Sequence, residues 1–257
     1  MHFYLLMKRT ERHSLIKNLY AAIPHGAPFD LEALGAQKVS AKQAAQYVKS
    51  GWLVRLGQGV YAYPSDSLDA PNCIRLLQTK SPGLHVGGKS ALDLHGVRHN
   101  LAFRQSWILW GESRFLLPEW FTSRFRARFV HTQLFDWKPS SLNDETISTP
   151  AGALENLKVS VPERAVLELL SQVGIHQDLE EARNLFDGLR NLRSELLGRL
   201  LACCTSVKAV RLFLTWARET GVVDVDQLLK DHKIKTGSKS RWITRLKDGT
   251  LLTLKNG

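Results

Sequence analysis

The sequence is poor in cysteine and methionine, and it contains no long apolar run. Three cysteines among 257 residues, two of them adjacent (Cys203 and Cys204), form neither a disulfide framework nor a Cys-x-x-Cys metal pair. No apolar stretch approaches the roughly 18 residues that span a membrane. Residues 1–7 are too short for the apolar core of a signal peptide and have no positive residues before them. We therefore expect a cytoplasmic protein with no membrane partner, no cofactor and no bound metal.

Acidic residues are scarce relative to basic ones. Lysine and arginine number 35 against 24 aspartates and glutamates, which gives a net charge of +11 and an isoelectric point near 9.7. The excess is spread along the chain: 8 basic and 5 acidic residues in 1–70, 11 and 7 in 71–161, and 16 and 12 in 162–257. Such a balance favours a polyanionic partner, most commonly nucleic acid, contacted by folded surfaces instead of a basic tail.

Residues 1–67 predict a winged helix-turn-helix domain. Apolar residues at helical spacing indicate helices over 10–22, 30–36 and 41–50, with Asp30 and Ser40 as N-caps. In the second helix Leu31 and Leu34 are expected to face inward, and in the third Ala44, Ala45 and Val48. A β-rich run over 52–63, interrupted at Gly57-Gln58-Gly59, indicates a hairpin with a glycine turn. Three helices followed by a hairpin is the order of a winged helix.

The third helix and the hairpin carry the residues expected to contact DNA. Lysine suits phosphate or guanine, and glutamine can bind adenine through two hydrogen bonds. The alternative is a solvated helix face and a solvated turn. The predicted DNA-binding set consists of Ser40, Lys42, Gln43, Gln46 and Lys49 on the helix, with Arg55 and Gln58 on the wing.

Residues 68–257 predict a second domain, so the fold class is α+β. Residues 68–161 read as a mixed α/β region, with short helices over 71–78 and 89–95 and strands over 105–110 and 124–134. From residue 162 onward apolar stripes predict a helical bundle with short loops. Pro162 stands in a first helical turn, and the expected caps of the following helices are Asp178, Ser194 and Ser206. The chain ends in a predicted hairpin over 241–255, turning at Asp248-Gly249.

Two stretches predict a second basic surface, for phosphates or an acidic protein. In the predicted strand 124–134, Arg124, Arg126 and Arg128 alternate with apolar residues and would share one face. Residues 230–247 hold seven basic residues against one acidic residue, among them Lys235, Lys239, Arg241 and Arg245. In both stretches the alternative is a face that meets only water.

Two enzymatic alternatives rest on short motifs. Residues 83–90 satisfy the phosphate-loop pattern G-x-x-x-x-G-K-S, but no strand precedes the motif and Leu84-His85-Val86 itself looks like a strand. A metal-dependent nuclease would need an upstream aspartate beside Asp136-Trp137-Lys138 or Asp231-His232-Lys233, and neither has one at a strand end. Nucleotide hydrolysis and DNA cleavage are thus weaker hypotheses than DNA binding alone.

Residues 39–61 resemble the AbiEi family, the antitoxins of abortive-infection type IV toxin–antitoxin systems. The family's wing pattern G-W-L-x-R-L-G-x-G-V-Y is present in full, and residues 86–96 and 161–170 resemble two later family segments. The resemblance runs from about residue 10 to about residue 175. It implies a repressor that binds inverted repeats in its own promoter, and a C-terminal region from about residue 71 that counters a nucleotidyltransferase-like toxin. A winged-helix regulator without a toxin is the other non-enzymatic alternative.

Overall fold

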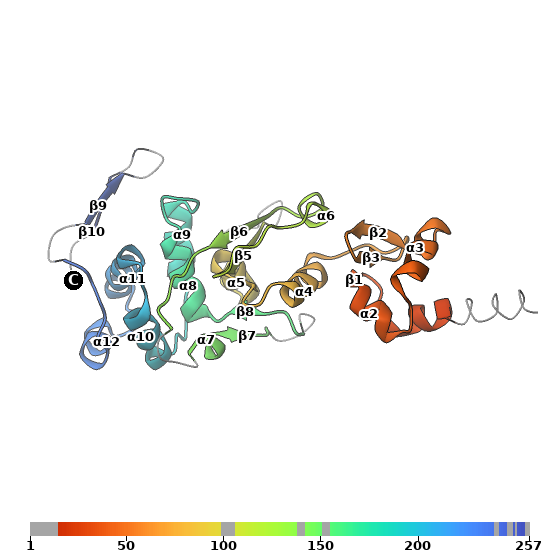
Figure 1. The fold of residues 1–257 in the computed structure, drawn as a ribbon. Coiled ribbons are helices and arrows are strands. Elements are labelled where there is room, and N and C mark those ends of the chain that lie inside the picture. The colour runs from red at the N-terminus through yellow and green to blue at the C-terminus, as the bar shows by residue number, and fades with distance from the viewer. Residues whose placement is uncertain are drawn as a thin grey trace, which may run out of the picture. The chain divides into compact units, whose positions relative to one another are not determined.

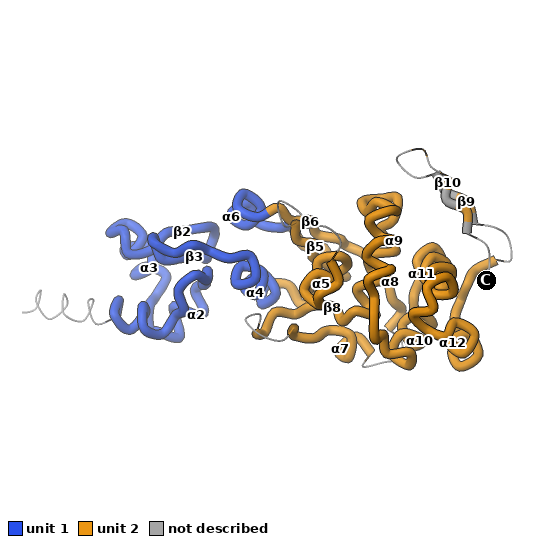
Figure 2. Tube along the Cα trace, turned by 180° about the vertical axis from the view of Figure 1, so that it is seen from behind, with its two compact units in different colours: residues 1–80, 117–125 blue, residues 81–116, 126–257 orange. Residues whose placement is uncertain are grey.

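A computed structural model describes residues 15–98, 106–137, 142–150, 155–238, 242–245, 249 and 251–254. The chain packs as two compact units (Figure 2): Met1–Lys80 with Leu117–Phe125 form unit 1, and Ser81–Leu116 with Arg126–Gly257 form unit 2. Unit 1 therefore includes a segment, residues 117–125, that stands between two parts of unit 2 in the sequence. The domain boundary expected after residue 67 falls within unit 1 and stays a prediction.

Unit 1 has the element order of a winged helix (Figure 1). A first helix is described over residues 15–22. It is followed by β1 (Phe29–Asp30), α2 (Leu31–Ala36), α3 (Ala41–Lys49), β2 (Val54–Gly57), β3 (Val60–Ala62) and α4 (Ala70–Lys80), and α6 (Glu119–Thr122) joins from the later segment. The three strands form an antiparallel sheet in the order β1-β3-β2. The three helices and the hairpin were predicted; β1 was missed because two residues carry no periodicity.

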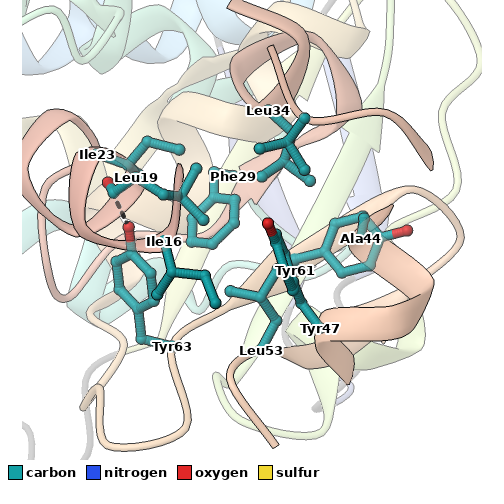
Figure 3. Close-up of a cluster of buried hydrophobic side chains, with 11 residues drawn as sticks. Ile16, Leu19, Ile23, Phe29, Leu34, Ala44, Tyr47, Leu53, Tyr61 and Tyr63 are labelled. Atoms are coloured by element: carbon teal, nitrogen blue, oxygen red, sulfur yellow. Dashed lines mark hydrogen bonds between the residues drawn. The ribbon is translucent and has the colours of Figure 1, made fainter. Parts of the chain in front are cut away.

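The core of unit 1 gathers apolar side chains from the helices and the sheet (Figure 3). The buried Tyr63 closes it at one side, and its hydroxyl donates a 2.8 Å hydrogen bond to the Leu19 carbonyl. Two expected core residues are corrected: Leu31 is 40% exposed, and Ala45 is exposed. In α3 the buried positions are Ala44 and Tyr47, three residues apart, and Ala45 lies about 100° around the helix from Ala44.

Unit 2 is built on a mixed five-stranded sheet in the order β6-β5-β4-β8-β7. Its strands are β4 (His85–Val86), β5 (Trp107–Gly111), β6 (Ala127–His131), β7 (Ile147–Ser148) and β8 (Val159–Ser160). β5–β6 and β4–β8 are parallel pairs, and β4–β5 and β7–β8 are antiparallel. The helices α5 (Gly88–Leu94) and α8 (Pro162–Ser171) pack against each other beside the sheet.

The predicted strand over 124–134 is wrong at both ends. Helical hydrogen bonds, such as Ser123 N to Glu119 O at 2.9 Å and Phe125 N to Phe121 O at 2.9 Å, continue α6 up to residue 125. The strand itself runs only from Ala127 to His131. Arginine alternates with apolar residues from residue 124 onward. This alternation is typical of a strand, and it predicted one where the chain forms a helical turn.

From residue 162 to residue 231 unit 2 is helical, as predicted, and the short helix α7 (Leu142–Glu145), which lies before residue 162, was not predicted. The helices from residue 162 onward are α8, α9 (Leu179–Asp187), α10 (Ser194–Cys203), α11 (Val207–Thr220) and α12 (Val225–Asp231). Asp178 and Ser206 cap their helices as expected, whereas Ser194 is the first helical residue and Arg193 occupies the cap position. The short α12, capped by Asp224, was not predicted. β9 (Trp242–Arg245) and β10 (Leu251–Leu254) form the expected antiparallel hairpin. Within the described residues, every helix is too short or too polar to cross a bilayer.

Candidate nucleic-acid interface

The third helix of the winged helix begins at a complete capping box. The backbone N–H of Gln43 donates to Ser40 Oγ at 3.3 Å, and the backbone N–H of Ser40 donates to Gln43 Oε1 at 2.8 Å. Each residue thus satisfies a backbone donor that the helix start leaves open. Ser40 and Gln43, both predicted to contact DNA, therefore also define where α3 begins, and the Gln43 amide oxygen is occupied by the cap.

The remaining predicted residues of α3 lie on its exposed face. Lys42, Gln46 and Lys49 are exposed, whereas Ala44 and Tyr47 on the opposite face are buried in the unit 1 core. Among the residues that the structure describes, neither lysine forms an ion pair. α3 therefore presents two lysines and a glutamine to the surroundings on one side, with Ala45 between them.

The wing is a tight hairpin whose tip is exposed. Gly57 pairs with Val60, which leaves Gln58 and Gly59 as a two-residue turn. Gly59 has φ of +69°, a left-handed conformation that a side chain rarely adopts, so the turn depends on glycine at this position. Gln58 and Arg55 are exposed, and Arg55 Nε donates to the Gly57 carbonyl at 3.2 Å. The wing residues predicted from the sequence thus lie together near the turn.

Two side chains from outside the hairpin contact the wing, and neither was predicted from the sequence. A Cβ placed on Gly59 would meet Leu31 Cδ1 at 3.6 Å, so the partly exposed Leu31 of α2 packs on the turn. A Cβ placed on Gly57 would come within 2.8 Å of Trp120 Cδ1, so the indole of α6 lies directly on β2. Trp120 belongs to unit 1 only through tertiary packing, and no sequence pattern links it to the wing.

The three arginines predicted to share a strand face do not do so. Arg124 lies at the end of the α6 turn in unit 1, where its Nη1 donates to the Trp120 carbonyl at 2.6 Å. Arg126 and Arg128 belong to unit 2, and of the three only Arg128 lies in β6. Arg128 is partly buried, and this burial lowers its pKa. The helical turn before β6 breaks the expected alternation.

The second predicted basic stretch is described only in part. Lys235 is exposed, and Arg245 lies in β9, although its side chain is outside the described residues, as are Lys239 and Arg241 altogether. Within this stretch, residues 236–238 are held by the buried Arg211 of α11. Its guanidinium donates to the carbonyls of Thr236 (2.7 Å) and Ser238, and Gly237 between them has φ of +79°. This anchor was not predicted from the sequence.

In the segment with the phosphate-loop pattern, the groups that would bind a phosphate contact side chains of the protein itself. His85 and Val86 form β4 inside the motif, and Gly88 begins α5. Its backbone N–H, which would bind a phosphate in a true phosphate loop, donates instead to Glu168 Oε2 at 2.9 Å. The motif lysine, Lys89, pairs with Glu181 at 3.0 Å.

Glu168 is the centre of a buried ionic cluster. Its carboxylate is fully buried and accepts hydrogen bonds from His85 Nε2 (2.9 Å), Arg164 Nε (2.8 Å) and Ser160 Oγ (2.9 Å). Burial opposes ionisation, but His85, Arg164 and the Gly88 N–H outweigh it and lower the pKa of Glu168 to about 2. The carboxylate therefore supplies the negative charge that a phosphate would bring.

Of the residues in the two nuclease half-motifs, Lys138 lies outside the described part of the chain, and within that part neither aspartate belongs to a group of three metal-binding side chains. Asp136 follows the isolated bridge of Phe135 to Cys204, and Asp231 ends α12, where its carboxylate accepts a hydrogen bond from Gln227 Nε2 at 2.7 Å. Over the ranges that the structure describes, histidine, cysteine, aspartate and glutamate nowhere form a group of three suited to hold a metal ion.

Three helices, a β1-β3-β2 sheet, an exposed polar third helix and a glycine-tipped hairpin define a winged-helix protein. Two family models match the chain. The model of the AbiEi antitoxin N-terminal domain, from transcriptional regulators, matches residues 12–103. The model of the AbiEi antitoxin, a transcriptional regulator of type IV toxin–antitoxin systems, matches residues 104–255. The chain belongs to this family of AbiEi antitoxin transcriptional regulators.

Structural comparison agrees with the fold assignment. The crystal structure of the RV2827C protein from Mycobacterium tuberculosis superimposes with a TM-score of 0.55 at 15% identity, covering 90% of this chain and 87% of that chain. At this identity the likeness concerns the fold alone. No curated protein sequence matches the chain.

Proposed function

We propose that this protein is a sequence-specific repressor that binds double-stranded DNA at inverted repeats in its own promoter. The observation that carries the proposal is the exposed face of α3, where Lys42, Gln46 and Lys49 stand opposite the buried Ala44 and Tyr47. A helix that buries one face in its own domain and leaves a polar, basic face open is suited to enter a major groove. The net charge of +11 supports attraction to a polyanion.

Different residues of this surface have different proposed roles. Lys42 and Lys49 contact phosphates and set affinity, whereas Gln46 contacts a base edge and sets sequence preference. The amide oxygen of Gln43 is held in the capping box, so Gln43 and Ser40 position the start of α3 and contribute to base contact only through their remaining donors. Arg55 and Gln58 at the wing tip contact the backbone or minor groove.

We further propose that the protein is the antitoxin of a nucleotidyltransferase-like toxin, countered directly or functionally, and that it is not itself an enzyme. Membership of the AbiEi family supports the antitoxin role. The occupation of the Gly88 N–H by Glu168 and the pairing of Lys89 with Glu181 speak against nucleotide hydrolysis. Co-expression with the product of an adjacent nucleotidyltransferase-like reading frame tests this role: restored growth supports it, and persisting toxicity contradicts it.

DNA binding is tested with the full chain and the duplex upstream of its own coding sequence, by fluorescence anisotropy across a salt series. Lys42→Ala and Lys49→Ala are each expected to weaken binding to all sequences and to lower the slope of log affinity against log salt by about one. Lys17→Ala, which removes the same charge from an exposed position of the first helix, is the matched control. Unchanged affinity and slope in both α3 variants would contradict the assignment of α3.

A further inference from the structure

The segment 117–125 is separated from the winged helix along the chain but packs within it. It connects β5 to β6, two paired strands of unit 2, yet its contacts place it in unit 1 (Figure 2). Its residues are anchored there by burial: Phe121 is fully buried and Trp120 is 7% exposed, and Phe121 packs on Phe125 with ring centroids 5.3 Å apart. The segment is thus a built part of unit 1 and not a surface loop.

The indole of Trp120 contacts the wing at one point. Gly57 is the last residue of β2, next to the exposed turn, and Trp120 Cδ1 lies only 2.8 Å from the position that a Cβ of residue 57 would take. The φ angle of Gly57 is outside the left-handed region, so close approach of the indole, and not backbone conformation, requires glycine there. Gly57 and Trp120 therefore form a matched pair.

Elsewhere the segment and the hairpin are less closely packed. A cavity of about 320 Å³ lies between them, lined by Val54, Leu56 and Ala62 of the hairpin and by Arg124 and Phe125 of the segment, among others. Arg124 also donates to the carbonyl of Trp120, which holds the short helix α6 in place. With open space further along β2, the contact at Gly57 is where this segment supports the wing close to its tip, in addition to the contact of Leu31 at Gly59.

We propose that Trp120 is a positioning residue for the wing, setting the position of Arg55 and Gln58 relative to α3 when the protein binds DNA. The inference rests on the proposed DNA-binding function and deepens it. Its consequence is that the wing contacts with the sugar–phosphate backbone depend on a residue supplied by the segment between β5 and β6, whereas base readout by α3 does not.

The test compares Trp120→Ala, Trp120→Phe and the control Thr122→Ala, an exposed residue of the same helix, in the full chain with the promoter duplex. Trp120→Ala is expected to lower affinity about tenfold and to lower the salt slope by about one, the equivalent of one phosphate contact. Discrimination against a duplex altered at the base pair read by Gln46 is expected to stay unchanged. Trp120→Phe, which retains an aromatic ring on Gly57, is expected to remain close to wild type.

These readouts separate wing positioning from loss of folded protein. Partial unfolding would lower the active fraction but leave the salt slope unaltered, so reduced affinity with an unchanged slope would overturn the proposal. Gly57→Ala supplies a second variant: its Cβ would displace the indole, so it should weaken binding in the wild-type background and add nothing in Trp120→Ala. Additive effects would also overturn it. Failure of the wild-type chain to bind the duplex would instead overturn the proposed function.

Discussion

Two glycine-containing turns of this protein look equally suited to contact phosphate, and the structure treats them in opposite ways. The wing turn at Gln58-Gly59 has an exposed tip, next to Arg55. The turn at Gly87-Gly88 opens a helix carrying Lys89, but Glu168 accepts the Gly88 N–H and the Trp110 indole covers both glycines. A glycine turn with a nearby basic residue is therefore not a phosphate site unless its donors are left open to an anion from outside.

The two turns also differ in what holds them. The wing is braced by apolar contacts, Leu31 at Gly59 and Trp120 at Gly57. The second turn is held by charge, through the cluster of Glu168, His85 and Arg164. Substitutions at the second turn should therefore act on stability, and those around the wing and α3 should act on DNA binding.

The largest effect is expected at the charged turn. Glu168→Ala leaves Arg164 and His85 buried without their anion, so the free energy of unfolding should fall by about 3–5 kcal/mol. Urea denaturation followed by tryptophan fluorescence measures this. Glu180→Ala, at an exposed position of α9, serves as the control and should stay within about 0.5 kcal/mol of wild type. A loss below about 1 kcal/mol for Glu168→Ala would show that the cluster does not stabilise the turn.

Low pH should remove the contribution of the Glu168 carboxylate to the free energy of unfolding. The folded pKa of Glu168, about 2, lies below its ordinary value of 4.5, so its charge stabilises the fold fully above pH 4.5 and ceases to do so as the pH falls through 2. The stability difference between wild type and Glu168→Gln should shrink by roughly 3 kcal/mol over this interval. Denaturant titrations at several pH values measure it, and a difference that is independent of pH would contradict the assignment.

At α3, two glutamines one turn apart should behave differently. Gln46→Ala should cost roughly 1–3 kcal/mol of discrimination at one base pair with stability unchanged. Gln43→Ala should instead lower the free energy of unfolding by about 0.5–1 kcal/mol because it removes half of the capping box, and Gln43→Glu should restore that stability. Competition binding on single-base variants of the duplex and thermal denaturation distinguish the two roles. If Gln43→Ala and Gln46→Ala reduced the discrimination between duplex variants equally, Gln43 would also contact a base.

The smallest effect is expected at Lys89. Its ammonium pairs with Glu181 while about one third exposed, so Lys89→Ala should change the free energy of unfolding by no more than about 1 kcal/mol. Isothermal titration with ATP and Mg²⁺ should show no binding by the wild-type chain and none by Lys89→Ala. Saturable ATP binding that is lost in Lys89→Ala would revive the phosphate-loop interpretation and remove the contrast between the two turns.

Much of the secondary structure was predictable because its determinants are local. The caps Asp30, Ser40, Asp178 and Ser206 stand at the helix starts where the residue types predicted them. The glycine turn of the wing followed from residues adjacent in the chain. β1 was missed because two residues carry no periodicity, and α12 was not predicted although helices of similar length, α2 and α5, were.

The candidate site was predictable only in part. The exposure of Lys42, Gln46 and Lys49 follows from helical spacing around buried residues. The second role of Gln43, the helical turn at Arg124 and the contact of Trp120 with Gly57 depend on atoms that meet only after folding. Alternation of residue types was a misleading guide at Arg124, because the same pattern fits a strand and the end of a helix.

The amino-acid sequence by itself determined the order of helices and hairpins in unit 1 and the basic character of α3, because capping, periodicity and turn chemistry act between near neighbours. Tertiary structure alone decided that Glu168, 80 residues from Gly88, fills one glycine turn and that Trp120 supports the other. Both outcomes depend on which distant side chains the packing brings to a backbone position, and local residue patterns carry no record of that.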